Sequence, residues 1–183
     1  MFSNYYSFSR EESDDIQYTF STEYNRAVFV SFSPNTYDEH LEEFPTLLEH
    51  GYSFGILSKK FSKDLSNNDD LIFYTIYQII KDFVSDDIEK TTVMLYHCDT
   101  SDGRGASRDK LFSNWEKKVE ETSLFKYSVQ VEVPVPGENV TKTHYVGFIT
   151  FTENPNIHTV KEEFEQFCYH IVQPKDSDLD LEV

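Results

Sequence analysis

The sequence predicts an α+β fold, in which a single, mostly antiparallel β-sheet of about six to seven strands carries three main helices packed on it. Three observations lead to this prediction. Apolar and polar residues alternate with period two in the first third of the chain and again over residues 125–152. Residues 69–84, 101–121 and 156–173 carry apolar residues at helical spacing. The short segment before residue 99 is apolar on both faces, as expected of a central strand.

The length and composition favour one folded domain. A chain of 183 residues is long enough for one well-developed core, so we expect a single domain over residues 1–173 and a flexible acidic tail over residues 174–183. The apolar share is only 38%, but aromatic residues reach 16%. Because each aromatic ring buries a large area, aromatic side chains can supply most of the core.

The first third of the chain predicts an antiparallel meander. Tyr6 and Phe8 begin an alternating pattern that recurs over residues 16–20, and a third strand pattern follows over residues 27–32. Short polar segments at residues 11–15 and 21–23 are the expected turns.

Pro45 divides the next segment. Residues 37–50 keep helical spacing, but a proline clashes in a helix interior, so we expect two short helical pieces, the second running from Pro45 to Gly51. A strand over residues 52–57 and a polar connector over residues 58–68 follow.

The remaining elements follow in order. Residues 69–84 form the strongest helical pattern, with Asp69 among its capping candidates, and the central strand comes next. After the helix expected to run to about residue 121, residues 125–133 predict a strand with one water-exposed face. It forms a hairpin with residues 145–152, and Asn156 can cap the last helix.

The charge restricts the possible partners. The chain has 33 acidic residues against 16 Lys and Arg, a formal net charge of −17. Such a surface repels a phosphate backbone, so we expect no direct nucleic-acid binding. It favours solubility and partners with a basic surface, and it is compatible with an acidic nucleic-acid mimic.

The cysteines and the apolar segments predict a cytoplasmic protein. Cys98 and Cys168 lie in apolar patterns without metal-ligand spacing, as expected of buried free thiols in a reducing compartment. The first residues lack a signal-peptide pattern, and no apolar stretch approaches the roughly 20 residues that span a bilayer.

The loop between the central strand and the next helix is the first candidate site. Free amides at a helix N-terminus, with the permissive backbone of two glycines, favour an anion such as a phosphorylated small molecule. Two arginines four residues apart share a helical face and can hold the same anion. The candidate ligand- or partner-binding residues are Asp99, Ser101, Asp102, Arg104 and Arg108.

A structural role explains the same loop without a ligand. Its polar residues are good helix caps, and Arg104 and Arg108 can pair with Asp99 and Asp102. The two aspartates are also weak candidates for a Mg²⁺ site, but no complete metal site is predicted. His97 and Cys98 point to opposite faces of a strand, so they cannot act as a nucleophile and base pair.

The loop also carries a resemblance to a family. Cys98 to Arg104, followed by Arg108, Phe112 and Trp115, resembles the C-D-[ST]-S-D-G-R loop of a family of small uncharacterised bacterial proteins. The resemblance implies a bacterial cytosolic origin, and it implies no particular reaction or cofactor.

The sequence therefore predicts no catalytic residue and no cofactor. We expect a non-enzymatic protein-binding or regulatory module whose partner is another protein. The alternatives are an enzyme or sensor that binds a phosphorylated small molecule or Mg²⁺ at residues 98–108, and the acidic nucleic-acid mimic.

Overall fold

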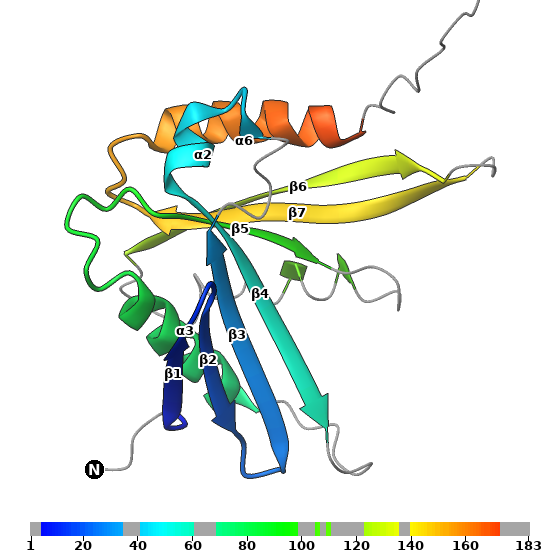
Figure 1. Cartoon of the computed structure of the whole chain (residues 1–183). Coiled ribbons are helices and arrows are strands. Elements are labelled where there is room, and N and C mark those ends of the chain that lie inside the picture. Colours follow the sequence, from blue (N-terminus) through cyan, green and yellow to red (C-terminus); the bar gives the residue numbers. More distant parts are fainter. Residues whose placement is uncertain are drawn as a thin grey trace, which may run out of the picture.

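The computed structural model describes residues 5–34, 41–60, 69–98, 105–106, 109–110, 123–135 and 140–172. These residues form one seven-stranded sheet with helices packed on it, which confirms the predicted α+β class (Figure 1). The strands are β1 (Phe8–Glu12), β2 (Ile16–Ser21), β3 (Arg26–Pro34), β4 (Gly51–Lys60), β5 (Val93–Cys98), β6 (Leu124–Pro134) and β7 (Thr141–Phe151). The helices within the described residues are α2 (Pro45–His50), α3 (Asp70–Phe83) and α6 (Ile157–Val172).

The strand order is β1-β2-β3-β4-β5-β7-β6, and all neighbours but one are antiparallel. The exception is the β4–β5 pair, which is parallel and covers only Gly51–Ser53 of β4. Beyond that short contact the two strands diverge, so β1–β4 and β5–β7 form two wings of one twisted sheet (Figure 1). The predicted meander and the predicted β6–β7 hairpin are both confirmed.

Helix α3 covers one face of the β1–β4 wing. Asp69 caps its first turn by accepting a hydrogen bond from the Leu71 amide at 3.1 Å, as the sequence predicted. Its apolar stripe packs on aromatic strand residues; the Phe83 ring stacks on Phe32 with centroids 3.8 Å apart. Tyr18, buried in the same core, donates a hydrogen bond to Asp82 at the polar edge of the helix.

Helices α6 and α2 cover the opposite face, over the β5–β7 wing (Figure 1). Phe164 and Phe167 of α6 are buried against this face. Glu163 joins the two helices, because its carboxylate accepts hydrogen bonds from the Thr46 hydroxyl and from the Leu47 amide at the start of α2. The free first-turn amides of a helix favour an acceptor of this charge. The two wings are thus covered on opposite faces.

Some predicted boundaries were wrong or cannot be compared. The first turn is shorter than expected, because β1 continues to Glu12 and pairs with Ile16. β4 continues through Lys60 into the segment predicted as a connector. The predicted helix over residues 101–121 is described only at 105–106 and 109–110, which are helical. The predicted tail at 174–183 lies outside the described residues. No helix in the described part of the chain is long and apolar enough to cross a membrane.

Candidate functional site

The loop that the sequence singled out cannot be compared with its prediction. β5 ends at Cys98, directly before it, and Cys98 is buried. The candidate residues lie outside the described residues; they are Asp99, Ser101, Asp102, Arg104 and Arg108. Whether they bind an anion, hold Mg²⁺ or pair with one another stays a prediction.

A group of polar side chains lies on one face of the sheet, and we call Tyr96, Asp109, Lys126 and Ser128 the polar cluster. The Lys126 ammonium is 3.0 Å from the Asp109 carboxylate and donates to the Ser128 hydroxyl at 3.1 Å. The Tyr96 hydroxyl donates to the same carboxylate oxygen at 3.3 Å. The strand partners of Lys126 and Ser128 place both on the α3 side of the sheet.

The polar cluster is largely withdrawn from water. The side chains of Lys126 and Asp109 are only 9% and 20% exposed, and Tyr96 is buried. Burial, and then the charge of Asp109, raise the pKa of the Tyr96 hydroxyl, so it keeps its proton and acts as a donor. Gly147 lies against the Tyr96 ring, where a Cβ atom would come within 2.3 Å of the hydroxyl oxygen. The packing around Tyr96 therefore depends on a glycine.

The polar cluster corrects one sequence prediction. Lys126, Ser128, Gln130 and Glu132 were expected on a water-exposed strand face. Gln130 and Glu132 are exposed there, but Asp109 lies against Lys126, which also contacts Ser128. The sequence could not show this, because Asp109 and Lys126 are separated by 17 positions and by a strand boundary. This ion pair holds Asp109 against the sheet.

An apolar cavity of about 280 Å³ lies on the other face of the same strands, beneath the last turns of α6. Strands β5, β6 and β7 supply its floor and α6 supplies its roof. Its lining residues are Leu95, Tyr96, His97, Val131, Val133, His144, Val146, Phe167 and Cys168. None of these carries a carboxylate, although the chain as a whole is strongly acidic.

Two histidines contribute the polar part of the cavity wall. His97 Nε2 and His144 Nδ1 are 2.8 Å apart, and the two rings are nearly parallel, with centroids 5.0 Å apart. His97 pairs with Val146 in the sheet, which places His144 two residues farther along the same face. The sequence treated its histidines as scattered, because this pair is 47 positions apart and only the strand register brings it together.

The cysteines agree with the sequence prediction of buried free thiols, and they lie on opposite faces of the sheet. Burial, and then the charge of Glu165, raise the pKa of the Cys168 thiol to about 12. Cys168 is therefore an apolar wall of the cavity at neutral pH and a poor nucleophile. Within the described residues, no group of three or more His, Cys, Asp or Glu side chains is arranged to hold a metal ion.

Residues 68–166 match the model of a family described as a family of unknown function (DUF6169). This region is more than half of the chain. The chain belongs to this family. The predicted resemblance to an uncharacterised family is confirmed at that level, whereas the loop motif stays a prediction. No curated protein and no solved structure matches the chain significantly.

The region matched by DUF6169 contains the polar cluster, the histidine pair and the strand floor of the cavity. Phe167 and Cys168, from the roof of the cavity, directly follow its last residue. The family match therefore covers the polar cluster and most of the cavity lining, but it assigns a role to neither.

Proposed function

We propose that the chain is a non-enzymatic binding protein that holds a small apolar group in the cavity beneath α6. The observation that carries the proposal is the cavity itself, about 280 Å³ with an apolar wall and one polar pair. Small-molecule sites have this character, being mostly apolar with a few polar groups that orient the ligand. The volume lies near the lower limit of the roughly 300–1,000 Å³ common for such sites, so the occupant is small.

The physical gain from filling the cavity supports this function. Interiors are close-packed, and side chains that face an empty volume lack attractive contacts on one side. An apolar occupant restores those contacts and removes its own surface from water, which contributes about 25 cal/mol for each Å². The polar cluster fits a structural role on the other face, since Lys126 and Asp109 neutralise each other.

A thermal-shift screen with small apolar molecules tests this function, because a ligand that binds the folded state raises the Tm. Val146→Phe fills the cavity and is expected to abolish the shift. Val140→Phe is the matched control, since Val140 is 54% exposed on the same hairpin and outside the cavity lining. The proposal fails if no compound raises the Tm, or if Val146→Phe leaves the shift unchanged.

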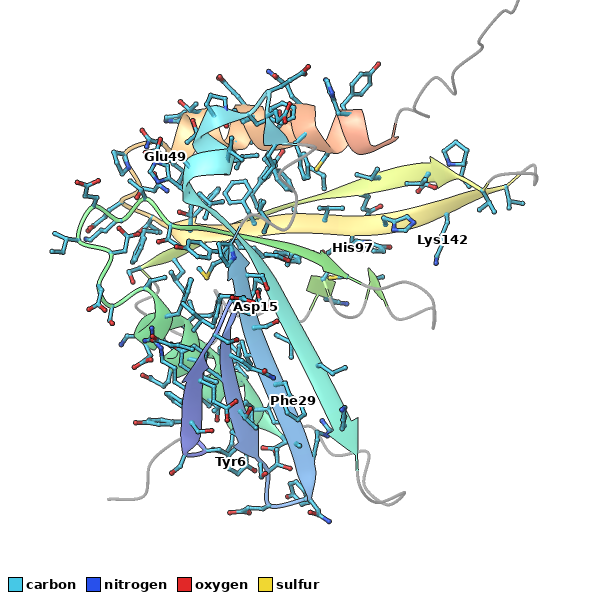
Figure 2. All side chains as sticks on the ribbon, viewed as in Figure 1. Tyr6, Asp15, Phe29, Glu49, His97 and Lys142 are labelled. Atoms are coloured by element: carbon cyan, nitrogen blue, oxygen red, sulfur yellow. The ribbon has the colours of Figure 1, made fainter. Side chains whose placement is uncertain are left out.

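A protein partner is the second candidate function, and it is favoured by the face of the β1–β4 wing that no described helix covers. The described helix against this wing, α3, lies on the other face. Phe29, which is labelled in Figure 2, and Leu57 are cross-strand neighbours on this face, and Leu57 is 56% exposed. A shallow hollow runs between them and Gly55. The net charge of −17 favours a partner with a basic surface, and the predicted setting is a bacterial cytoplasm.

Affinity capture with paired variants tests the second candidate. Leu57→Arg is expected to release a partner that the original chain retains, because a charge replaces an exposed apolar contact. Ile88→Arg is the matched control, since Ile88 is 91% exposed and outside this face. If Leu57→Arg retains the partner as well as the original chain does, and added salt does not release it, a basic partner at this surface is contradicted.

A further inference from the structure

We propose that the occupant of the cavity is a small aliphatic carboxylic acid. Its hydrocarbon part fills the apolar volume, and its carboxylate accepts a hydrogen bond from His144, which His97 holds in the required tautomer. This inference rests on the proposed function and adds the chemical class of the ligand.

The distribution of polarity in the cavity selects an amphipathic ligand. Leu95, Val131, Val133, Val146 and Phe167 give an apolar wall, and the Cys168 thiol is uncharged at neutral pH. A polar or charged group placed against this wall would lose hydration without gaining a partner. The strong hydrogen-bond donors in the described lining are the paired imidazoles of His97 and His144, and an imidazole can carry positive charge. The ligand therefore has one polar end and one apolar end.

The short contact between the rings fixes where one proton lies. At 2.8 Å, His97 Nε2 and His144 Nδ1 share a single hydrogen, since protons on both nitrogens would clash and repel. When His97 donates this hydrogen, neutral His144 must carry its own proton on Nε2. His144 is then an N–H donor at Nε2. His97 is a positioning residue in this arrangement.

An anion at the histidine end of the cavity is compatible with the acidic chain. The net charge of −17 acts over long distances, but salt screens exposed charges beyond about 8 Å at physiological ionic strength. The described residues that line the cavity carry no carboxylate, and the charge of Glu165 acts on the cavity from α6, at the Cys168 thiol. Lys142 precedes His144 by two residues in β7, so it lies on the same sheet face and adds positive charge. Figure 2 shows His97 on β5 and Lys142 near the outer end of β7.

The cavity volume predicts how affinity depends on chain length. Each methylene group moved from water into the apolar wall strengthens binding by about fourfold. This increase continues until the chain fills the volume of about 280 Å³, after which longer acids gain nothing or bind more weakly. A surface that binds fatty acids without a defined volume gives no such limit.

Isothermal titration calorimetry with the straight-chain acids from butanoate to dodecanoate tests the proposal, with the matching primary alcohols as probes of the head group. We expect affinity to rise with length and then stop rising, and each acid to bind at least about tenfold more tightly than its alcohol, as a charged hydrogen bond provides. Acids and alcohols that bind equally would overturn the carboxylate assignment and leave the proposed function standing. Probes that all fail to bind would overturn both.

Variants locate the head group. His144→Gln is expected to remove the preference for acid over alcohol while alcohol binding stays within about threefold. His158→Gln, at an exposed position of α6, is the matched control and should keep the preference. A preference that persists in His144→Gln would overturn the assignment. The comparison of acid with alcohol in the unaltered protein decides the question if His144→Gln does not fold.

Discussion

The two faces of the sheet around β5 differ in what lies against them, a polar cluster on one face and an apolar cavity on the other. On one face, Tyr96 joins a polar cluster in which the charges of Lys126 and Asp109 neutralise each other. On the other face, beneath α6, His97 borders an apolar cavity of about 280 Å³. Neighbouring strand residues point to opposite faces, so two adjacent side chains serve unlike sites. One face buries an ion pair, whereas the other keeps an unfilled volume, and the second is therefore the face that we propose for binding.

The largest expected effect comes from breaking the buried ion pair. Asp109→Ala removes the carboxylate that neutralises Lys126, whose side chain is 9% exposed. Losing one partner of a buried pair costs about 3–5 kcal/mol. Denaturant unfolding monitored by circular dichroism should show a decrease of about 3 kcal/mol in the free energy of unfolding.

An exposed ion pair gives the control for this effect. Lys90 and Glu153 also pair, but their side chains are 43% and 66% exposed. Glu153→Ala should therefore change the free energy of unfolding by less than about 1 kcal/mol. Equal effects of Asp109→Ala and Glu153→Ala would show that the buried ion pair does not stabilise the fold more than an exposed one.

A smaller loss is expected from crowding Tyr96. Gly147→Ala places a Cβ atom 2.3 Å from the Tyr96 hydroxyl oxygen and 2.7 Å from the Tyr127 carbonyl oxygen, so the backbone or the ring must shift. Overpacking of this kind costs about 1–3 kcal/mol, measurable as a lower Tm. Gly55→Ala is the control, because its Cβ would meet only the Ser31 hydroxyl, which can rotate away. A Tm that falls more for Gly55→Ala would refute the close packing of Tyr96.

The raised pKa of the Cys168 thiol predicts that the protein loses stability at alkaline pH. The unfolded Cys168 thiol loses its proton near pH 9, whereas the folded thiol, with its pKa raised to about 12, keeps it. The unfolded state therefore binds fewer protons above pH 9, and the free energy of unfolding falls as the pH rises from about 9 to 12. Cys168→Ala should make this part of the pH profile flatter. An unchanged slope would mean that the thiol is not withdrawn from water.

The sequence predicted those features that depend on neighbours along the chain. The alternation of Tyr18, Phe20 and their neighbours predicted the meander, and Asp69 and Pro45 marked helix starts that the structure has. Both are consequences of local backbone preferences, which are encoded within a few residues.

Features that depend on register across the sheet could not be predicted in this way. His97 and His144 come together because β5 and β7 pair with His97 opposite Val146, and no local pattern fixes that register. Lys126 was predicted to be exposed because apolar and polar residues alternate around it, whereas in the structure it pairs with Asp109, which lies 17 positions away. The cavity depends on how far α6 extends over three strands, which is a property of the whole assembly.

The most direct test of the account is methyl NMR of protein labelled at its leucines and valines, titrated with octanoate. We predict saturable shifts for Leu95, Val131, Val133 and Val146, which line the cavity, and none for Val28 and Val30 beneath α3. Cys168, which also lines it, should become more slowly alkylated in the same titration. Shifts confined to the α3 face, or no shifts at all, would contradict the claim that the cavity beneath α6 is the binding site.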